Sequence, residues 1–456
     1  MMRMIGLTLA VLLAATSAAR AWYPYGPRYE KWQAKRPFTM TALHNSVPTD
    51  RLPDRIARFK AAGLNMLMTI KPPKGEHFHK AADEAGLAWA TWHPERFASA
   101  TWKINNPGTP LDGADGKKLF THVLRTPGCA FVQVSDGPKE EKHLDDIAAF
   151  SQWLRRTYPD ILVFASLSIA KIDHDLFVKK TRPDVFSYYK YPLYQGGEAD
   201  MREFLWHMKW ARDSARKHRL PFWMYLQAWG VTTPSGNERL RHPHEADLRY
   251  VVFTFLAHGG NGAMMFLYYG MHEPMVVDTV IDEARTPSKR HRYENTVTRP
   301  AWHAVRDVAP EVQTLARALL NLRTKDPIGY TGKTPVRCKR FKGHGRLRAV
   351  ANRDNAKESA LVAFFDDQAE QEYFMVVNLK HGEKMSKTDG LQTLRLTFTD
   401  GVQKIERLNR LTGRVETLKT KAEGSRRILD VRLEGGTGDL FKWSNGKPWT
   451  LRKAAR

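Results

Sequence analysis

Cysteine is nearly missing from this chain of 456 residues, which has only Cys129 and Cys338. Two cysteines cannot build a disulfide scaffold, and the sequence alone does not place these two side by side. The chain also lacks a CxxC motif, an HExxH motif and a glycine-rich phosphate loop. No metal or nucleotide site is therefore indicated, and we expect no cofactor.

Long apolar runs are missing except at the amino end. There, an apolar stretch over residues 5–15 follows Arg3 and precedes the sequence Ala19-Arg20-Ala21. The stretch is too short for a membrane span and leads to the small-x-small pattern of signal-peptidase sites. We therefore expect a signal peptide over residues 1–21 and a secreted or periplasmic protein that begins near Trp22, with no integral membrane span.

Negative charge is in short supply. The chain has 72 Lys and Arg residues against 48 Asp and Glu residues, a net charge of +24, and loss of Arg3 and Arg20 with the signal peptide leaves +22. Such an excess of positive charge indicates what kind of partner the protein binds, and it says nothing about the fold. For an exported chain rich in Trp and Tyr, it favours a sulfated or uronic polysaccharide over nucleic acid. A basic surface that serves only solubility is the alternative.

Short apolar runs of strand length alternate with helix-like segments from about residue 37 to residue 270. Amphipathic stretches at 52–63 and 143–160 have apolar residues at helical spacing. Eight such units in about 250 residues predict a (β/α)₈ barrel, with a doubly wound open sheet as the rival. The expected strands are Phe38–Leu43, Leu64–Ile70, Leu87–Trp92, Ala130–Val134, Ile161–Leu167, Val185–Tyr189, Phe222–Gln227 and Ala263–Tyr268.

The pattern changes after about residue 325. Segments such as SALVAFFDD, EYFMVVNLKH and TLRLTFTD read as strands separated by Gly, Asp and Asn turns. We therefore predict a barrel domain over 22–325 and a C-terminal antiparallel β-sandwich over 326–456. Residues 331–456 have a net charge of +12 and residues 22–330 one of +10. The smaller domain is the more densely basic one and is the candidate anchor on an anionic polymer.

The chemistry of a barrel belongs at the carboxyl ends of its strands. Aromatic rings stack on sugars, and amide, lysine and histidine groups bind hydroxyl or sulfate groups, so the residues expected there suit a saccharide. The catalytic candidates are Asp136, Glu140 and Glu273. The substrate-binding candidates are His44, Lys71, Trp92, His93, Tyr189, Tyr191, Gln227, Trp229 and Tyr268.

Several segments resemble the clan A barrel glycoside hydrolases, especially β-galactosidase-like members of family 42 and their exported relatives. The resemblance is carried by FVQVSDGP (131–138), DVFSYYKYP (184–192), PFWMYLQAWG (221–230), the stretch 242–270 and the motif Gly436–Phe441. It implies a barrel whose fourth strand ends in an Asp-Glu-Pro-like turn with the glutamate as general acid. This chain departs from that pattern: Gly137 follows Asp136, and the seventh strand ends at Gln227 with no carboxylate before Glu238.

Three functions remain open on this sequence. A hydrolase would use Asp136, Glu140 or Glu141 as the acid and Glu273 as a second carboxylate. A polysaccharide lyase would use Tyr, His and Lys, with Lys71 or Lys190 neutralising a uronic carboxylate and Tyr189, Tyr191 or His93 moving the proton. The third is a barrel that binds glycans without cleaving them. We expect the hydrolase.

Structural roles compete with catalysis at several acidic positions. Asp136 could cap the helix expected at 139–155, and Glu140 and Glu141 could favour its dipole. Glu245 and Asp247 are more typical of the first turn of the helix near Ala246, and His242 and His244 of a solvated loop.

The first testable prediction concerns charge. Affinity for an anionic glycan should fall steeply as salt rises, because exposed charges are screened over about 8 Å at physiological ionic strength. Binding of the mature chain to a sulfated polysaccharide at low and high sodium chloride concentration measures this. Equal affinity at both concentrations would mean that the surplus charge serves solubility.

Overall fold

The computed structural model describes residues 25–44, 52–69, 77–92, 128–138, 140–168, 172–195, 199–232, 239–269, 273–280 and 293–452. The expected signal peptide lies outside these residues. None of the helices within the described ranges is long and apolar enough to cross a membrane. Cys129 and Cys338 are both free thiols.

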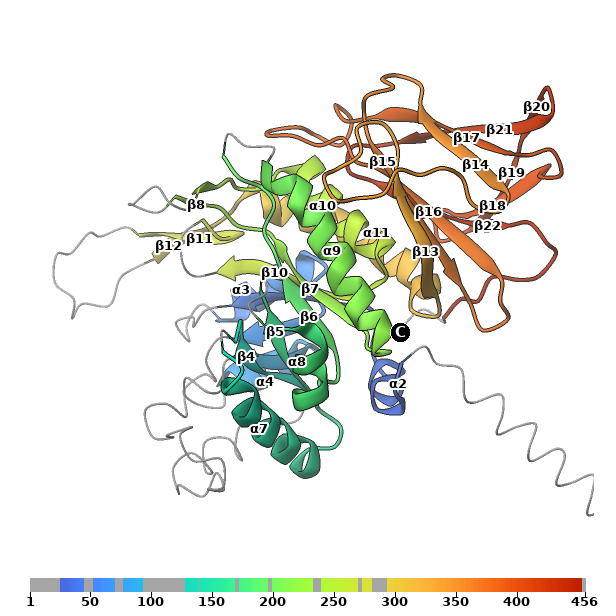
Figure 1. Cartoon of the computed structure of the whole chain (residues 1–456). Coiled ribbons are helices and arrows are strands. Elements are labelled where there is room, and N and C mark those ends of the chain that lie inside the picture. The colour runs from blue at the N-terminus through green and yellow to red at the C-terminus, as the bar shows by residue number, and fades with distance from the viewer. Residues whose placement is uncertain are drawn as a thin grey trace, which may run out of the picture.

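Eight parallel strands close into a barrel in the order β1-β10-β7-β6-β5-β4-β3-β2 (Figure 1). Every expected strand is present, and closure between β1 and β10 excludes the open sheet. The (β/α)₈ prediction is therefore confirmed. The strands are β1 Thr39–His44, β2 Met66–Thr69, β3 Ala88–Trp92, β4 Cys129–Asp136, β5 Leu162–Leu167, β6 Phe186–Tyr189, β7 Phe222–Gln227 and β10 Gly260–Tyr269.

Amphipathic helices pack on the outside of the barrel. Their apolar faces and the outward-facing strand residues form one apolar layer, in which Val132 and Val134 of β4 meet residues such as Leu144 and Phe150. The helices that connect the strands are α3 Leu52–Ala61, α4 His77–Glu84, α7 His143–Thr157, α8 His174–Thr181, α9 Ala199–Lys217 and α10 Glu245–Ala257.

A short helix, α2 Pro27–Gln33, covers the amino ends of the barrel strands. The indole Nε1 of Trp32 donates to the carbonyl of Ala130 at the start of β4 (2.8 Å), and the hydroxyl of Tyr25 donates to Asn261 at the start of β10 (2.7 Å). The ring of Trp32 also packs against Trp223 inside the barrel. Because α2 occupies the amino end, a site in the barrel must lie at the carboxyl ends of the strands.

An antiparallel β domain follows α11 Pro300–Leu319 and consists of two sheets. Both sheets contribute side chains to a single apolar cluster, with Phe364 and Phe374 from one sheet and Leu396 and Phe398 from the other. Along β17 buried residues alternate with half-buried ones, the period expected of a strand with one face in a core. The first sheet contains β13 Arg323–Tyr330, β15 Ala360–Asp366, β16 Glu372–Asn378, β22 Gly438–Trp443, β18 Lys404–Leu408 and β19 Val415–Lys419. The second contains β14 Leu347–Asn352, β17 Gln392–Thr399, β21 Arg426–Leu433 and β20 Lys421–Glu423.

Two small hairpins complete the described chain: β8 Val231–Thr232 with β9 Arg239–Leu240, and β11 Val276–Val280 with β12 Tyr293–Thr298. The first hairpin leads into α10. There His244 is the N-cap and its backbone N–H donates to Asp247 (3.1 Å), so Glu245 and Asp247 do open this helix. The carboxylate of Asp247 is also bound by Arg241 and His381.

A buried ion-pair network joins the β domain to α10 and α11, which lie between the β domain and the barrel (Figure 1). Arg249 of α10 makes two hydrogen bonds to Glu311 of α11 (3.1 and 2.7 Å). Arg410, between β18 and β19, binds the same carboxylate (2.8 Å) and also Asp439 (2.5 Å). Burial alone would lower the pKa of Arg410, but the charges of Asp439 and Glu311 outweigh it and raise the pKa above its usual value.

The network predicts a large stability difference between two Glu→Gln variants. Glu311→Gln leaves the buried guanidinium groups of Arg249 and Arg410 without a shared anion, and should cost about 3 to 5 kcal/mol. Glu423→Gln removes only an exposed partner of Arg395 and should cost under about 1 kcal/mol. The midpoints of denaturant unfolding measure both. Equal shifts would contradict the importance of the network.

Candidate functional site at the carboxyl ends of the barrel strands

Asp136 faces the inside of the barrel because of an irregularity in β4. Simple alternation from Val132 and Val134, which point outward, would turn Asp136 outward as well. A β-bulge between Gln133 and Ser135 changes the register against β5 and re-aims the end of the strand. The half-buried carboxylate then acts electrostatically on three tyrosines of the barrel interior, Tyr189, Tyr191 and Tyr225.

Gly137 allows a hydroxyl group to approach the turn after Asp136. Its backbone has a φ of +57°, and its N–H donates to the carbonyl of Ser166 (2.8 Å). A Cβ at this position would lie 2.7 Å from the hydroxyl oxygen of Tyr189 and 3.3 Å from the hydroxyl of Ser168. The space beside the turn is therefore taken by Tyr189, and only glycine fits both the conformation and the contact.

The tyrosines near Asp136 are held protonated. Burial raises the pKa of Tyr189 to about 12, the charge of Asp136 adds to the shift, and a hydrogen bond with Ser168 opposes it. Burial followed by the same carboxylate raises the pKa of Tyr191 and Tyr225 well above the usual value. At neutral pH the site therefore presents phenolic O–H groups beside a carboxylate.

Aromatic rings from four strand ends gather around Phe266 of β10. Its ring centroid lies 4.9 Å from that of Trp229, 5.6 Å from Tyr191 and 6.4 Å from Trp92. We call the set Trp92, Tyr189, Tyr191, Tyr225, Trp229 and Phe266 the aromatic mouth. Trp92 and Trp229 are buried, whereas Tyr189, Tyr191 and Phe266 are half-buried and form its accessible part.

Glu273 lies on the side of the mouth formed by β7 and β10. Its backbone exchanges two hydrogen bonds with Gly230 (both 3.1 Å), directly after Trp229. The half-exposed carboxylate is 3.8 Å from the guanidinium of Arg299. The structure thus places Asp136, the last residue of β4, and Glu273, in the segment between β10 and β11, at the same end of the barrel.

Glu140 does not have the environment that we expected of a general acid. It is exposed and forms an ion pair with Lys142 (2.6 Å), and the hydrogen bond and charge of that lysine lower its pKa. A general acid needs a raised pKa, so we no longer assign Glu140 this role. Helix α7 begins only at His143, with Lys142 as N-cap and no side-chain cap, so Asp136 does not cap it.

Gln227 and Tyr268 are structural, which corrects their assignment to substrate binding. The amide of Gln227 is fully buried and bonds the backbone of Leu193, Trp229 and Arg241. Tyr268 points outward, where its hydroxyl donates to the carbonyl of Arg55 (3.1 Å). Neither side chain lines the mouth.

Some of the remaining candidate binding residues are buried, and others lie outside the described part of the chain. His44 is buried, and its ring lies 5.4 Å from that of Tyr268 and 5.5 Å from that of Tyr269. Lys190, next to Tyr189, is also buried. Lys71 and His93 lie outside the described residues, so their role in binding stays a prediction.

The sequence interpretation missed Tyr225 and Phe266, which lie inside strands and not after them. Tyr225 donates a buried hydrogen bond to Gln133 (2.6 Å), which joins β7 to β4 across the barrel interior. The signal was present in the alternation of PFWMYLQ, where Trp223 and Tyr225 share one face. The half-buried His242 was read as a solvated loop residue, but it packs against Gly230, and burial lowers its pKa to about 4.

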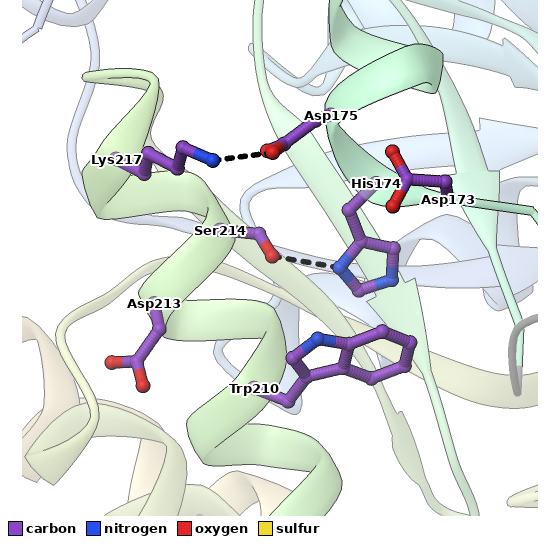
Figure 2. Close-up of a pocket in the computed structure, with 7 residues that line it drawn as sticks. All are labelled: Asp173, His174, Asp175, Trp210, Asp213, Ser214 and Lys217. Atoms are coloured by element: carbon purple, nitrogen blue, oxygen red, sulfur yellow. Dashed lines mark hydrogen bonds and ion pairs between the residues drawn. The ribbon is translucent and has the colours of Figure 1, made fainter.

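A cavity of about 220 Å³ between α8 and α9 lies on the outside of the barrel and has a structural character. Figure 2 shows His174 over the indole of Trp210 (3.8 Å), with its Nδ1 toward Ser214 (2.7 Å). Lys217 pairs with Asp175 in the same view. These polar groups serve contacts between the two helices, and no part of the aromatic mouth reaches them. In the described part of the chain, no group of three His, Cys, Asp or Glu side chains is placed to hold a metal ion.

Comparisons with known proteins find similarity in structure only. No protein-family model and no curated protein matches the sequence. A β-glucuronidase of Faecalibacterium prausnitzii shares 11% identity at a TM-score of 0.42, over 61% of this chain and 49% of its own. A β-galactosidase of Halorubrum lacusprofundi shares 12% identity at 0.40, over 61% of this chain and 58% of its own. A GH27 β-L-arabinopyranosidase of Geobacillus stearothermophilus shares 12% identity at 0.45, over 92% and 99%.

This chain spans about half the length of the β-glucuronidase and 58% of the β-galactosidase. All three TM-scores are below 0.5, so we draw no conclusion about activity from them. The resemblance to family 42 stays a prediction.

The close contact at Gly137 predicts how two glycine substitutions differ. Gly137→Ala and Gly424→Ala, with φ of +57° and +59°, should both cost about 1 to 2 kcal/mol for left-handed backbone. Gly424 has open space around it, whereas a methyl at Gly137 collides with Tyr189. Gly137→Ala should therefore cost more and change the near-ultraviolet circular dichroism of the tyrosines. Equal losses in denaturant unfolding would contradict the contact.

Proposed function

We propose that this protein is an exported glycoside hydrolase that cleaves an anionic, sulfated polysaccharide or its oligosaccharides, with Asp136 as a catalytic carboxylate. The observation that carries the proposal is the position of Asp136, turned into the aromatic mouth by the bulge in β4. Functional groups of barrel enzymes lie at this end of the strands.

The accessible part of the mouth suits a sugar. The rings of Tyr189, Tyr191 and Phe266 stack on one another and are half-buried, so their exposed parts offer apolar surface and the two tyrosines add phenolic hydrogen-bonding groups. Such a combination of aromatic walls and a few polar groups is typical of small-molecule sites. A pyranose ring, with apolar faces and an edge of hydroxyl groups, matches both features.

Charge supports the anionic substrate. The sequence without its signal peptide has a net charge of +22, and the C-terminal β domain, which we interpret as the expected β-sandwich, is its more densely basic part. Long-range attraction raises the rate at which an oppositely charged polymer is captured. The β domain would then hold the polymer while the barrel cleaves it.

A second carboxylate is needed for the usual two-carboxylate hydrolysis. Glu273 is our candidate, because it lies next to Trp229 on the side of the mouth formed by β7 and β10. Its carboxylate forms an ion pair with the guanidinium of Arg299 at 3.8 Å.

A panel of polymers tests the reaction type. Purified mature protein is incubated with a sulfated galactan, a polyuronate and a neutral glucan, and both reducing ends and ultraviolet absorbance of unsaturated sugars are recorded. Reducing ends without unsaturation support the proposal. Unsaturated products would instead show the lyase, and retention of a polymer without products the binding-only barrel.

Two isosteric variants test the site. Asp136→Asn should lower the rate on the cleaved polymer by about 10²-fold or more, because it removes the charge inside the mouth. Glu140→Gln removes an exposed carboxylate outside it and should keep full activity. Circular dichroism and retention on the polymer confirm that both variants fold. Full activity of Asp136→Asn, or a loss confined to Glu140→Gln, would overturn the assignment.

A further inference from the structure

The hydroxyl of Tyr189 occupies a distinctive position in the mouth. It lies beside the turn that follows Asp136, where a Cβ on Gly137 would be only 2.7 Å away. Gly137 itself offers no functional group. The functional group beside the turn that follows Asp136 is therefore the phenol of Tyr189 from β6.

The other tyrosines near Asp136 are less available. Tyr225 is buried and its hydroxyl already donates to Gln133 (2.6 Å). Tyr191 is half-buried like Tyr189, and its ring packs against those of Phe266 and Trp229. Tyr189 is half-buried, and its hydrogen bond with Ser168 anchors the phenol oxygen. If the hydroxyl of Ser168 donates in that bond, the phenolic proton of Tyr189 is left for a ligand.

We infer that Tyr189 is the proton donor to the leaving oxygen of the glycosidic bond, with Asp136 as the neighbouring negative charge. The inference rests on the proposed function and assigns one step within it. Positioned proton donors contribute typically about 10² to 10⁴-fold to the rate.

The reaction has two parts, departure of the leaving group and addition of water. The bond between the anomeric carbon and the leaving oxygen breaks, its electron pair stays on that oxygen, and the oxygen takes the phenolic proton of Tyr189. The tyrosinate then takes a proton from a water molecule whose hydroxyl bonds to the anomeric carbon. The carboxylate of Asp136 faces the positive charge that develops on the sugar, and the phenol is restored.

A phenolic donor has a characteristic pH dependence. Its folded pKa of about 12 keeps it protonated throughout the neutral and mildly alkaline range. A carboxylic donor with a raised pKa of about 6 to 7 would lose its proton, and the rate would fall, above that pH. The kcat/KM of this protein should therefore show no alkaline fall between about pH 7 and pH 10.

The test compares two adjacent tyrosines. Tyr189→Phe removes the proposed donor, whereas Tyr188→Phe removes a hydroxyl that bonds His207 on the outer face of the barrel (2.9 Å). Each variant and the wild type are assayed on two substrates of the sugar that the wild type releases: its 4-nitrophenyl glycoside, whose leaving group needs little protonation, and its natural disaccharide.

We expect Tyr189→Phe to lose about 10²-fold or more in kcat on the disaccharide, at little change in KM, and to keep most of its rate on the nitrophenyl glycoside. Tyr188→Phe should match the wild type on both. Equal loss on both substrates, or no loss on the disaccharide, would overturn the role of Tyr189 and leave the proposed function intact. A wild type that cleaves no glycan would overturn both.

Discussion

The buried network around Glu311 decides how the two parts of this molecule are arranged. Helix α10 lies between the barrel and the β domain, and every residue from Ala246 to Ala257 is buried. A helix that is covered all round has no solvated face for its charged residues. Arg249 can be part of it only because Glu311 and the β domain supply partners inside the protein. The β domain is thus attached to the outside of the barrel, near the connection from β7 to β10.

This attachment also explains why the glycines after β21 approach the helix so closely. A Cβ on Gly436 would lie 2.4 Å from the carbonyl oxygen of Ala246, so the turn touches the backbone of α10 directly. Apolar residues on the same side, such as Leu361 and Met375, join the outer apolar layer of the barrel. The interface between the β domain and the barrel contains both ion pairs and a common apolar core. It resists sliding of one part over the other, because any displacement would leave buried charges without partners. The β domain is therefore held in a fixed orientation relative to the barrel.

The sequence predicted the strands well and the side-chain directions less well. Apolar runs such as Ile161–Leu167 are long enough for strands and short for helices, so all eight barrel strands were found. The direction of a side chain at the end of a strand depends on the pairing register of that strand, and a shift of one residue turns the side chain to the opposite face of the sheet. Asp136 faces inward only because of the bulge after Gln133, and Tyr268 faces outward although it lies near the end of β10. Glu140 was misjudged because α7 begins three residues later, which leaves that carboxylate in the solvated turn before the helix.

The pair Tyr188 and Tyr189 shows how much function depends on this alternation. Both are phenols on one strand, yet Tyr188 bonds a histidine among the outer helices and Tyr189 lies beside Asp136. The period of two guarantees that one of them points into the barrel, but the sequence does not say which. Burial then changes the chemistry of the inward tyrosine. Desolvation and a nearby carboxylate both disfavour its tyrosinate form, so the phenol stays protonated. A site of this kind keeps its hydrogen-bond donors at the pH values where exposed carboxylic acids have already lost theirs. The site therefore offers phenolic hydrogen-bond donors to an oxygen-rich ligand.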